Sequence, residues 1–283
     1  MIKNHHMSRR LSIAYTMILF AFGSVASGCS SASSPVPVRH SVAAIRHEAP
    51  QAIGKWTTKA PMPTLRGYLA AGVINGLLYA VGGADRPSVL RKVEAYHPTT
   101  NTWTIRRSMP TARYGLAAGV MNGILYAVGG EARSPGVVRK VEAYHPTTNT
   151  WTIRRSMPTA RGQLAVGVIN GILYAVGGGN ENEAYDPVTD TWTTKAPMPT
   201  ARTLLAVGVI NGILYAVGGY HDGDLNTVEA YDPATDTWTT APSMPTASVG
   251  LATGVVGGRL FAIGGRGNHW RHKVQAFNPR KSP

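Results

Sequence analysis

The chain has 283 residues, of which 43% are apolar and only 15% charged, against about 25% charged in an average soluble domain. Frequent glycine (32) and proline (19) favour many short strands over long helices, and the apolar fraction argues against disorder. A single cysteine excludes an intrachain disulfide framework and any Cys-cluster metal site, and the formal net charge is +14.

The first segment has the layout of an export signal. Three basic residues, Lys3, Arg9 and Arg10, precede an uncharged stretch at 11–28 that ends in small residues. The stretch is too short, and too rich in serine and glycine at its end, for a transmembrane helix of about 20 apolar residues. We therefore predict a signal peptide at 1–28.

The cysteine follows this segment directly. Residues 25–29, Val-Ala-Ser-Gly-Cys, resemble the bacterial lipobox, although Ala26 stands where leucine is usual. The resemblance implies that Cys29 is lipidated and becomes the mature N-terminus. Residues 29–53, which begin with a Ser-rich run, then form a flexible tether. The predicted location is the cell envelope, with a lipid anchor in the membrane, and ordinary secretion is the alternative.

The remainder is one repeat in five copies. Gly-Gly pairs begin at 82, 129, 177, 218 and 264, and five tryptophans recur at the same spacing of 41–48 residues. Residues 91–113 and 139–161 are identical, which indicates a duplication. We delimit the units at 64–110, 111–158, 159–199, 200–245 and 246–283.

Each unit contains four strand signals, which we call A to D in chain order. In the fourth unit they lie at 204–210, 213–217, 228–231 and around Trp238, and Asn211-Gly212 favours a two-residue hairpin turn between the first two. Four-stranded meanders at this period predict an all-β fold, a β-propeller with one blade per unit.

Four elements recur in order: Gly-Gly after a Leu-Tyr-Ala-Val strand, Glu-Ala-Tyr-Asp/His-Pro, Thr-Trp, and Met-Pro-Thr-Ala-Arg. This pattern resembles the kelch repeat and covers 54–283. The resemblance implies a kelch-type propeller, here with five four-stranded blades instead of the usual six or seven. The last unit lacks its Trp strand, so we expect the strand at 55–59 to complete that blade and close the ring.

Loops that differ on a repeated scaffold are where specificity usually lies, and the D–A and B–C loops differ most between the units. In an antiparallel meander the D–A and B–C loops emerge at the same end of the propeller. The kelch resemblance implies that the arginines after Met-Pro and their polar neighbours line the mouth of the central channel at that end. The predicted ligand-binding residues are Arg66, Tyr68, Arg113, Tyr114, Arg161, Gln163 and Arg202, together with the loop residues Glu131, Asn180, Tyr220, His221 and Arg266. The alternative is that the arginines only brace adjacent blades.

Charge is divided into sectors. Residues 64–158 carry a net +8, residues 159–245 a net −6 and residues 246–283 a net +6. Together with export, this distribution favours a protein or glycan ligand over nucleic acid.

The sequence offers little for catalysis. With its only cysteine at the export site, the chain cannot form the Tyr–Cys crosslink of copper oxidases built on kelch propellers. Acid–base residues for a sugar epimerase, another activity found on this scaffold, cannot be placed; the candidates are Glu131, Glu181, Glu183, His221, Asp222, Asp224 and His269. We predict no metal and no cofactor, since residues 221–226 lack the full calcium-loop pattern. The predicted function is a non-catalytic binding module, with a carbohydrate-active envelope enzyme as the alternative.

Overall fold

The computed structural model describes residues 57–267, except 86, and residues 273–279. Within these residues the fold is all-β, and its strands belong to the compact unit that contains Ala60–Pro283. The strands form five antiparallel sheets, one in each predicted repeat, and a short hairpin of β3 (Ala84–Asp85) and β4 (Ser88–Val89). No described helix is long and apolar enough to span a membrane.

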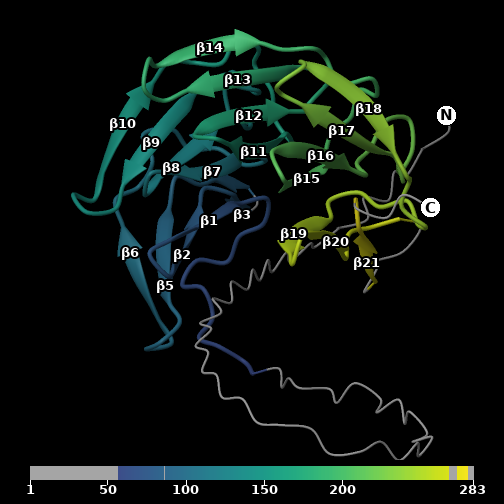
Figure 1. The fold of residues 1–283 in the computed structure, drawn as a ribbon. Helices are drawn as coiled ribbons and strands as arrows, with labels where there is room; N and C mark the ends of the chain where they lie inside the picture. Colours follow the sequence, from purple (N-terminus) through teal and green to yellow (C-terminus); the bar gives the residue numbers. More distant parts are fainter. Residues whose placement is uncertain (1–56, 86, 268–272, 280–283) are drawn as a thin grey trace, which may run out of the picture. The chain divides into compact units, whose positions relative to one another are not determined.

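Each sheet is a propeller blade whose strands follow one another in chain order (Figure 1). Blade 1 contains β1 (Ala70–Ile74), β2 (Leu77–Val81), β5 (Val93–His97) and β6 (Thr102–Arg106). Blade 2 contains β7 (Ala117–Met121), β8 (Ile124–Val128), β9 (Val141–His145) and β10 (Thr150–Arg154). Blade 3 contains β11 (Ala165–Ile169), β12 (Ile172–Val176), β13 (Asn182–Asp186) and β14 (Thr191–Thr194).

The last two blades complete the series. Blade 4 contains β15 (Ala206–Ile210), β16 (Ile213–Val217), β17 (Val228–Asp232) and β18 (Thr237–Ala241). Blade 5 has three described strands, β19 (Ala252–Val256), β20 (Arg259–Ile263) and β21 (Val274–Phe277). The innermost strands β1, β7, β11, β15 and β19 pack against one another in this order. The five-bladed, all-β propeller predicted from the repeats is therefore confirmed.

The hairpin turns between the first two strands of blades 1 to 4 follow the expected chemistry. Their asparagines, Asn75, Asn122, Asn170 and Asn211, all have φ of +49° to +51°, and each precedes a glycine with positive φ. Asparagine and glycine tolerate the left-handed conformation that a type I′ turn requires at both central positions. The turn fixes the register, so that Val209 pairs with Leu214, for example.

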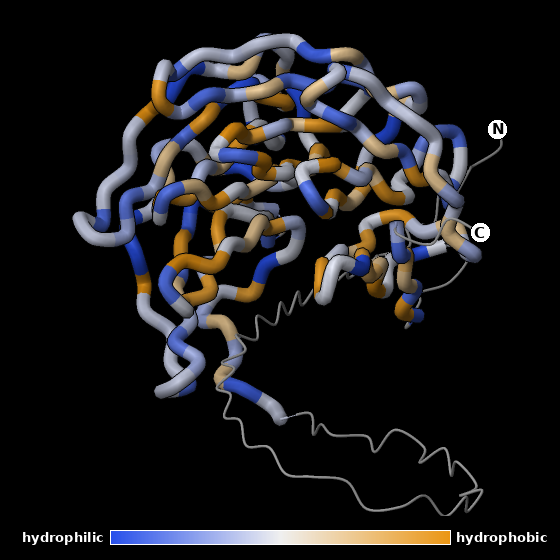
Figure 2. The backbone as a smooth tube through the Cα atoms, in the orientation of Figure 1, coloured by the Kyte–Doolittle hydropathy of each residue, from blue (hydrophilic) through white to orange (hydrophobic). Residues whose placement is uncertain are grey.

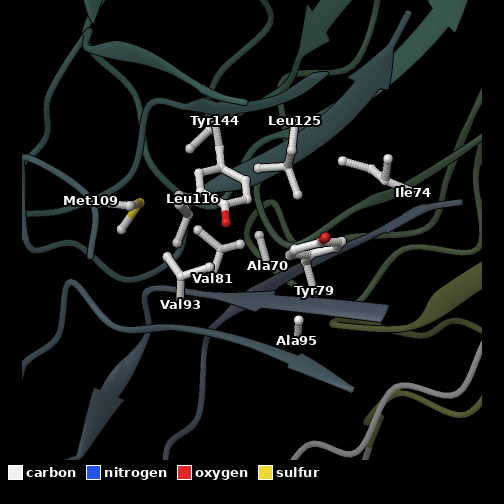
Figure 3. Packing of buried hydrophobic residues seen from close by; sticks show 11 residues of the cluster. Ala70, Ile74, Tyr79, Val81, Val93, Ala95, Met109, Leu116, Leu125 and Tyr144 are labelled. Carbon is white, nitrogen blue, oxygen red and sulfur yellow. The ribbon is translucent and has the colours of Figure 1, made fainter. Parts of the chain in front are cut away.

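Small residues on one blade receive large residues from the next. A Cβ atom on Gly72 would lie 3.0 Å from Leu125 Cδ1, and one on Gly119 would lie 2.9 Å from Leu173 Cδ1. Tyr79 and Tyr144 also pack across the first seam, with ring centroids 5.7 Å apart, within the cluster of Figure 3. Apolar residues are concentrated along the inner strands (Figure 2), as this packing requires.

The fifth blade departs from this pattern on the face that would meet blade 1. No atom lies within 4 Å of a Cβ built on Gly254, and Val256 and Ile263 are 63% and 43% exposed. Val81, which corresponds to Ile263, is fully buried. No packing comparable to the other seams joins β19 to β1 in the described residues.

The strand predicted to close the ring is therefore not formed by its described part. Residues 57–59 have no strand conformation, and residues 55–56 lie outside the described residues. Ala60, which follows, is held by blade 1: its amide donates to Asn101 Oδ1 (2.8 Å) and its carbonyl accepts from Trp103 Nε1 (2.9 Å). Pairing with β21 requires blades 1 and 5 to meet, and within the described ranges no seam like the other four joins them.

Candidate functional site

The repeated arginines lie beneath the channel mouth and not on it. Arg66, Arg113, Arg161 and Arg202 are at most 4% exposed. Each pairs with a buried glutamate on the third strand of the same blade, at N–O distances of 2.5–3.1 Å. The arginines are therefore too buried to line the mouth as predicted, and each holds the segment that enters a blade to that same blade, whereas the alternative had them bracing adjacent blades.

Arg113 illustrates how the pair is held. Its guanidinium donates to Glu142 Oε2 (2.8 Å) and to the carbonyls of Gly129 (2.8 Å) and Lys140 (2.9 Å). Thr111 Oγ1 donates to the other carboxylate oxygen of Glu142 (2.6 Å). The threonine and arginine of Met-Pro-Thr-Ala-Arg thus both bind the glutamate of Glu-Ala-Tyr. Burial lowers the pKa of Arg113, and the charge and hydrogen bond of Glu142 oppose that shift.

The last blade carries a neutral version of this pair. Ser248 replaces the arginine, and its Oγ donates to the Gly264 carbonyl (2.9 Å). Gln275 replaces the glutamate, and its Oε1 accepts from the Thr246 amide (3.0 Å). Charge is lost from both partners together, which avoids an unpaired buried ion.

These glutamates were missed as partners of the arginines. They are Glu94, Glu142, Glu183 and Glu229, and each is at most 2% exposed. A signal was present in the sequence: glutamate and arginine recur together in four units, and both are replaced in the fifth.

The mouth itself is formed by the segments that follow the arginines. Successive backbone amides bond from blade to blade: Gly115 to the Tyr68 carbonyl (2.9 Å), Gln163 to Gly115 (2.7 Å), Leu204 to Gln163 (2.9 Å) and Gly250 to Leu204 (2.8 Å). All five residues have φ between +53° and +61°. Residues with a bulky side chain, such as leucine and tyrosine, rarely adopt this left-handed backbone conformation. Residues held in it cluster at functional sites.

Four predicted site residues come together at this level. Tyr114 Oη donates to Glu131 Oε2 (2.7 Å), and Gln163 Nε2 donates to Glu131 Oε1 (3.0 Å). The rings of Tyr68 and Tyr114 meet edge to face with centroids 6.1 Å apart. We call Tyr68, Tyr114, Glu131 and Gln163 the mouth cluster.

The mouth cluster occurs once, although it stands on repeated positions. The backbone of Glu131 forms an antiparallel β-bridge with that of Tyr114. The same bridge joins Ala84 to Gly67 in blade 1 and Tyr220 to Thr203 in blade 4. Only blade 2 supplies a carboxylate there. All four residues are partly exposed to solvent.

The other predicted residues occupy separate places. Arg266 bridges to Val249 in blade 5, Tyr220 is 46% exposed, and Asn180 and His221 are exposed. His221 Nε2 lies 3.8 Å from Asp222 Oδ2, with both side chains largely exposed.

The candidates for catalysis are dispersed in the same way. Glu183 is fixed to Arg161 in a buried pair. Glu181 has one buried carboxylate oxygen without a hydrogen-bond partner, and it lies on the B–C loop of blade 3. His269 lies outside the described residues. Within the described ranges, no three His, Cys, Asp or Glu residues are grouped as metal ligands.

The fold and the repeated ion pairs define a β-propeller with one motif per blade. The Kelch motif family model matches residues 65–110, 112–158, 160–199 and 201–245, so this chain belongs to the kelch-repeat family. Among solved structures it is similar to "Structure of YjhT", with a TM-score of 0.69 and 18% identity over 80% of this chain and 85% of that one. That likeness concerns the fold. A search of curated proteins finds no match.

Proposed function

We propose that this protein is a non-catalytic binding module of the bacterial cell envelope, anchored by lipid at Cys29, whose channel mouth binds a protein or glycan ligand. Kelch propellers commonly act as interaction modules, which supports a protein partner in general. The single observation that carries the proposal is the mouth cluster, because it departs from the repeat where the scaffold does not require it.

The chemistry of the cluster suits a polar ligand. Each oxygen of Glu131 already accepts one hydrogen bond, and a carboxylate oxygen has capacity for a second. A ligand hydroxyl or N–H group can take that position. Tyr68 and Tyr114 supply ring surface beside it, and an aromatic ring next to a hydrogen-bonding group is a common arrangement in binding sites.

The binding proposal is tested with two variants of the mouth cluster. Glu131→Gln and Tyr114→Phe, with the unaltered chain, are applied to arrays of glycans and of envelope proteins. We expect ligands of the unaltered chain to lose ~10-fold or more in affinity, because a lost hydrogen bond to a charged group costs about 1.5–3 kcal/mol.

A matched control lies at the opposite end of the propeller. Thr148→Ala removes an exposed hydroxyl that bonds Thr150 Oγ1 (2.8 Å), and it should leave binding unchanged. Equal affinity for the mouth variants, the control and the unaltered chain would refute the proposed face.

The anchor has its own test. Cys29→Ser should release the protein from the membrane fraction of expressing bacteria, and metabolic labelling with a fatty acid should disappear. Retention of the label would refute lipidation at Cys29 without affecting the proposal for the mouth.

A further inference from the structure

The outer strands of blades 1 and 2 carry a second feature. Six cationic residues cluster at corresponding ends of the two outer hairpins, and we call them the basic rim: Lys92, Arg106, Arg107, Lys140, Arg154 and Arg155. Lys92, Arg107, Lys140 and Arg155 are exposed, and Arg106 and Arg154 are half-buried. The next-to-last residue of each outer strand is an exposed isoleucine, Ile105 (73%) in β6 and Ile153 (78%) in β10.

The basic rim consists of two groups of three cations, one at the end of β6 and one at the end of β10. The Arg107 amide donates to Asn149 Oδ1 (2.9 Å), and its carbonyl accepts from Trp151 Nε1 (2.8 Å), so the first group lies against the turn of the outer hairpin of blade 2, and the second group lies at the other end of that hairpin. Lys140 Nζ donates to Thr111 Oγ1 (3.0 Å) in the segment that joins the blades. Lys140 and Ile153 line the same hollow of about 190 Å³.

The charge of the rim is largely uncompensated. Within the described part of the chain, none of the six residues forms an ion pair with a carboxylate. Glu142, the nearby glutamate of blade 2, is buried against Arg113. Asp190 accepts from the Arg155 amide (3.0 Å) and offsets part of the charge on the side toward blade 3.

The scaffold does not require these residues. In blade 3, Glu181 and Ala196 stand at the positions of Lys140 and Arg155, and in blade 4 Thr227 and Pro242 do. The isoleucines are exchanged as well, for Thr194 and Thr240. Those blades form the same four strands. The cations and the exposed apolar side chains therefore occur together in blades 1 and 2 and are absent together from these positions in blades 3 and 4, apart from Lys195.

We propose that the basic rim and its two isoleucines are a docking surface for an anionic lipid bilayer, separate from the ligand-binding mouth. Lysine and arginine near the surface are attracted by phosphate headgroups, and exposed isoleucines enter the interface between headgroups and acyl chains. The isoleucines decide between lipid and a soluble polyanion, because an apolar side chain gains nothing from a sulfate or phosphate group in water. This surface adds electrostatic attraction to the lipid anchor proposed at Cys29.

The test compares binding of the full chain to vesicles of phosphatidylcholine with and without phosphatidylglycerol. The rim variant combines Lys92→Thr and Lys140→Thr with Arg107→Ala and Arg155→Ala, residues that blades 3 and 4 already carry at these positions. The apolar segment at 11–28 is common to all variants, so the readout is the ratio of affinities for anionic and neutral vesicles. We expect the rim variant to lower this ratio by ~100-fold or more, since each cation near the surface contributes about fivefold.

Two further variants separate the possible causes. Arg133, Lys195, Arg259 and Lys273, all changed to alanine, remove the same net charge elsewhere and should change the ratio by less than about twofold. The pair Ile105→Thr and Ile153→Thr should weaken binding to anionic vesicles by ~10-fold while leaving its salt dependence intact. Circular dichroism of each variant establishes that it is folded.

Equal losses for the rim variant and its charge-matched control would overturn the proposal, since net charge alone would then explain binding. So would an unchanged ratio in the rim variant. The chain could instead bind a soluble sulfated polysaccharide as tightly as anionic vesicles, with no effect of the isoleucine substitutions. That result would overturn the proposal and identify a polyanion, not a lipid, as the ligand of the basic rim.

Discussion

Arg113 and Tyr114 are neighbours in the chain but belong to different regions. Arg113 is fully buried in an ion pair that recurs in four blades, whereas Tyr114 belongs to a mouth cluster found in one place. The first region is the same in four copies because the pair holds the third strand of each of these blades against the segment that enters the blade. In a repeat protein, then, repetition marks the scaffold, and departures from it mark the candidate function.

The largest expected effect comes from breaking one buried pair. Arg161→Met leaves Glu183 buried without its cation and should lower the free energy of unfolding by about 3–5 kcal/mol. The double variant Arg161→Met with Glu183→Leu should recover much of that loss, because no charge is left unpaired. Urea denaturation followed by circular dichroism measures both. If Arg161→Met is as stable as the unaltered chain, the ion pair does not stabilise the scaffold.

The next effect compares the same leucine in two repeats. Leu173 is fully buried against Gly119, and Leu173→Ala should cost about 2–5 kcal/mol of unfolding free energy. Leu78 occupies the same position in blade 1 but is only half-buried, and Leu78→Ala should cost roughly 1 kcal/mol. Denaturation midpoints at constant slope test this difference. Equal costs would mean that Gly254 receives Leu78 in solution and that the ring is closed.

A smaller effect is expected at the mouth. Tyr114→Phe removes the hydrogen bond to Glu131 and should change the free energy of unfolding by about 1 kcal/mol, since Glu131 is partly exposed and keeps its bond from Gln163. Thermal unfolding measures the change. A loss as large as that of Arg161→Met would make the mouth cluster part of the scaffold.

The smallest effect depends on pH. The hydrogen bond from Tyr231 and that from the Ala196 amide lower the pKa of Asp236 below its ordinary value. A carboxyl group with a lowered folded pKa stabilises the fold above its unfolded pKa of about 3.9, and that stability is lost as the pH falls through the folded value.

Asp236→Asn should therefore leave the fold intact and reduce its loss of stability in acid. Asn101 and Asn149 already accept the same tyrosine hydrogen bond in blades 1 and 2, at 2.7 and 2.8 Å. Unfolding free energies at neutral pH and near pH 3 provide the comparison. An identical acid sensitivity in the variant would exclude Asp236 as a contributor.

The sequence predicted the blades well because their signals are local. Asn211-Gly212 and the alternating strands specify a hairpin without reference to the rest of the chain. Chain order on a propeller also places Tyr114, Glu131 and Gln163 at one end, where they bond to one another, and their binding of a ligand stays a prediction. The sequence did not predict the burial of Arg113, which is 0% exposed. The residue type is the same for a buried and an exposed arginine, and only the presence of a partner distinguishes them.

Whether blades 1 and 5 pack together could not be predicted from the sequence for a different reason. Gly254 and Leu78 match the residues of the other seams, so pattern alone predicts that they meet. Whether they do depends on the rotation accumulated over four seams, which no local motif specifies.

The separation of scaffold and mouth is tested most directly by chemical modification of arginine. The folded protein is treated with phenylglyoxal, and the modified residues are identified by mass spectrometry. We expect Arg66, Arg113, Arg161 and Arg202 to remain unmodified while exposed Arg107 and Arg155 react. Modification of the four buried arginines as fast as of Arg107 would contradict the account and return them to the ligand-binding surface.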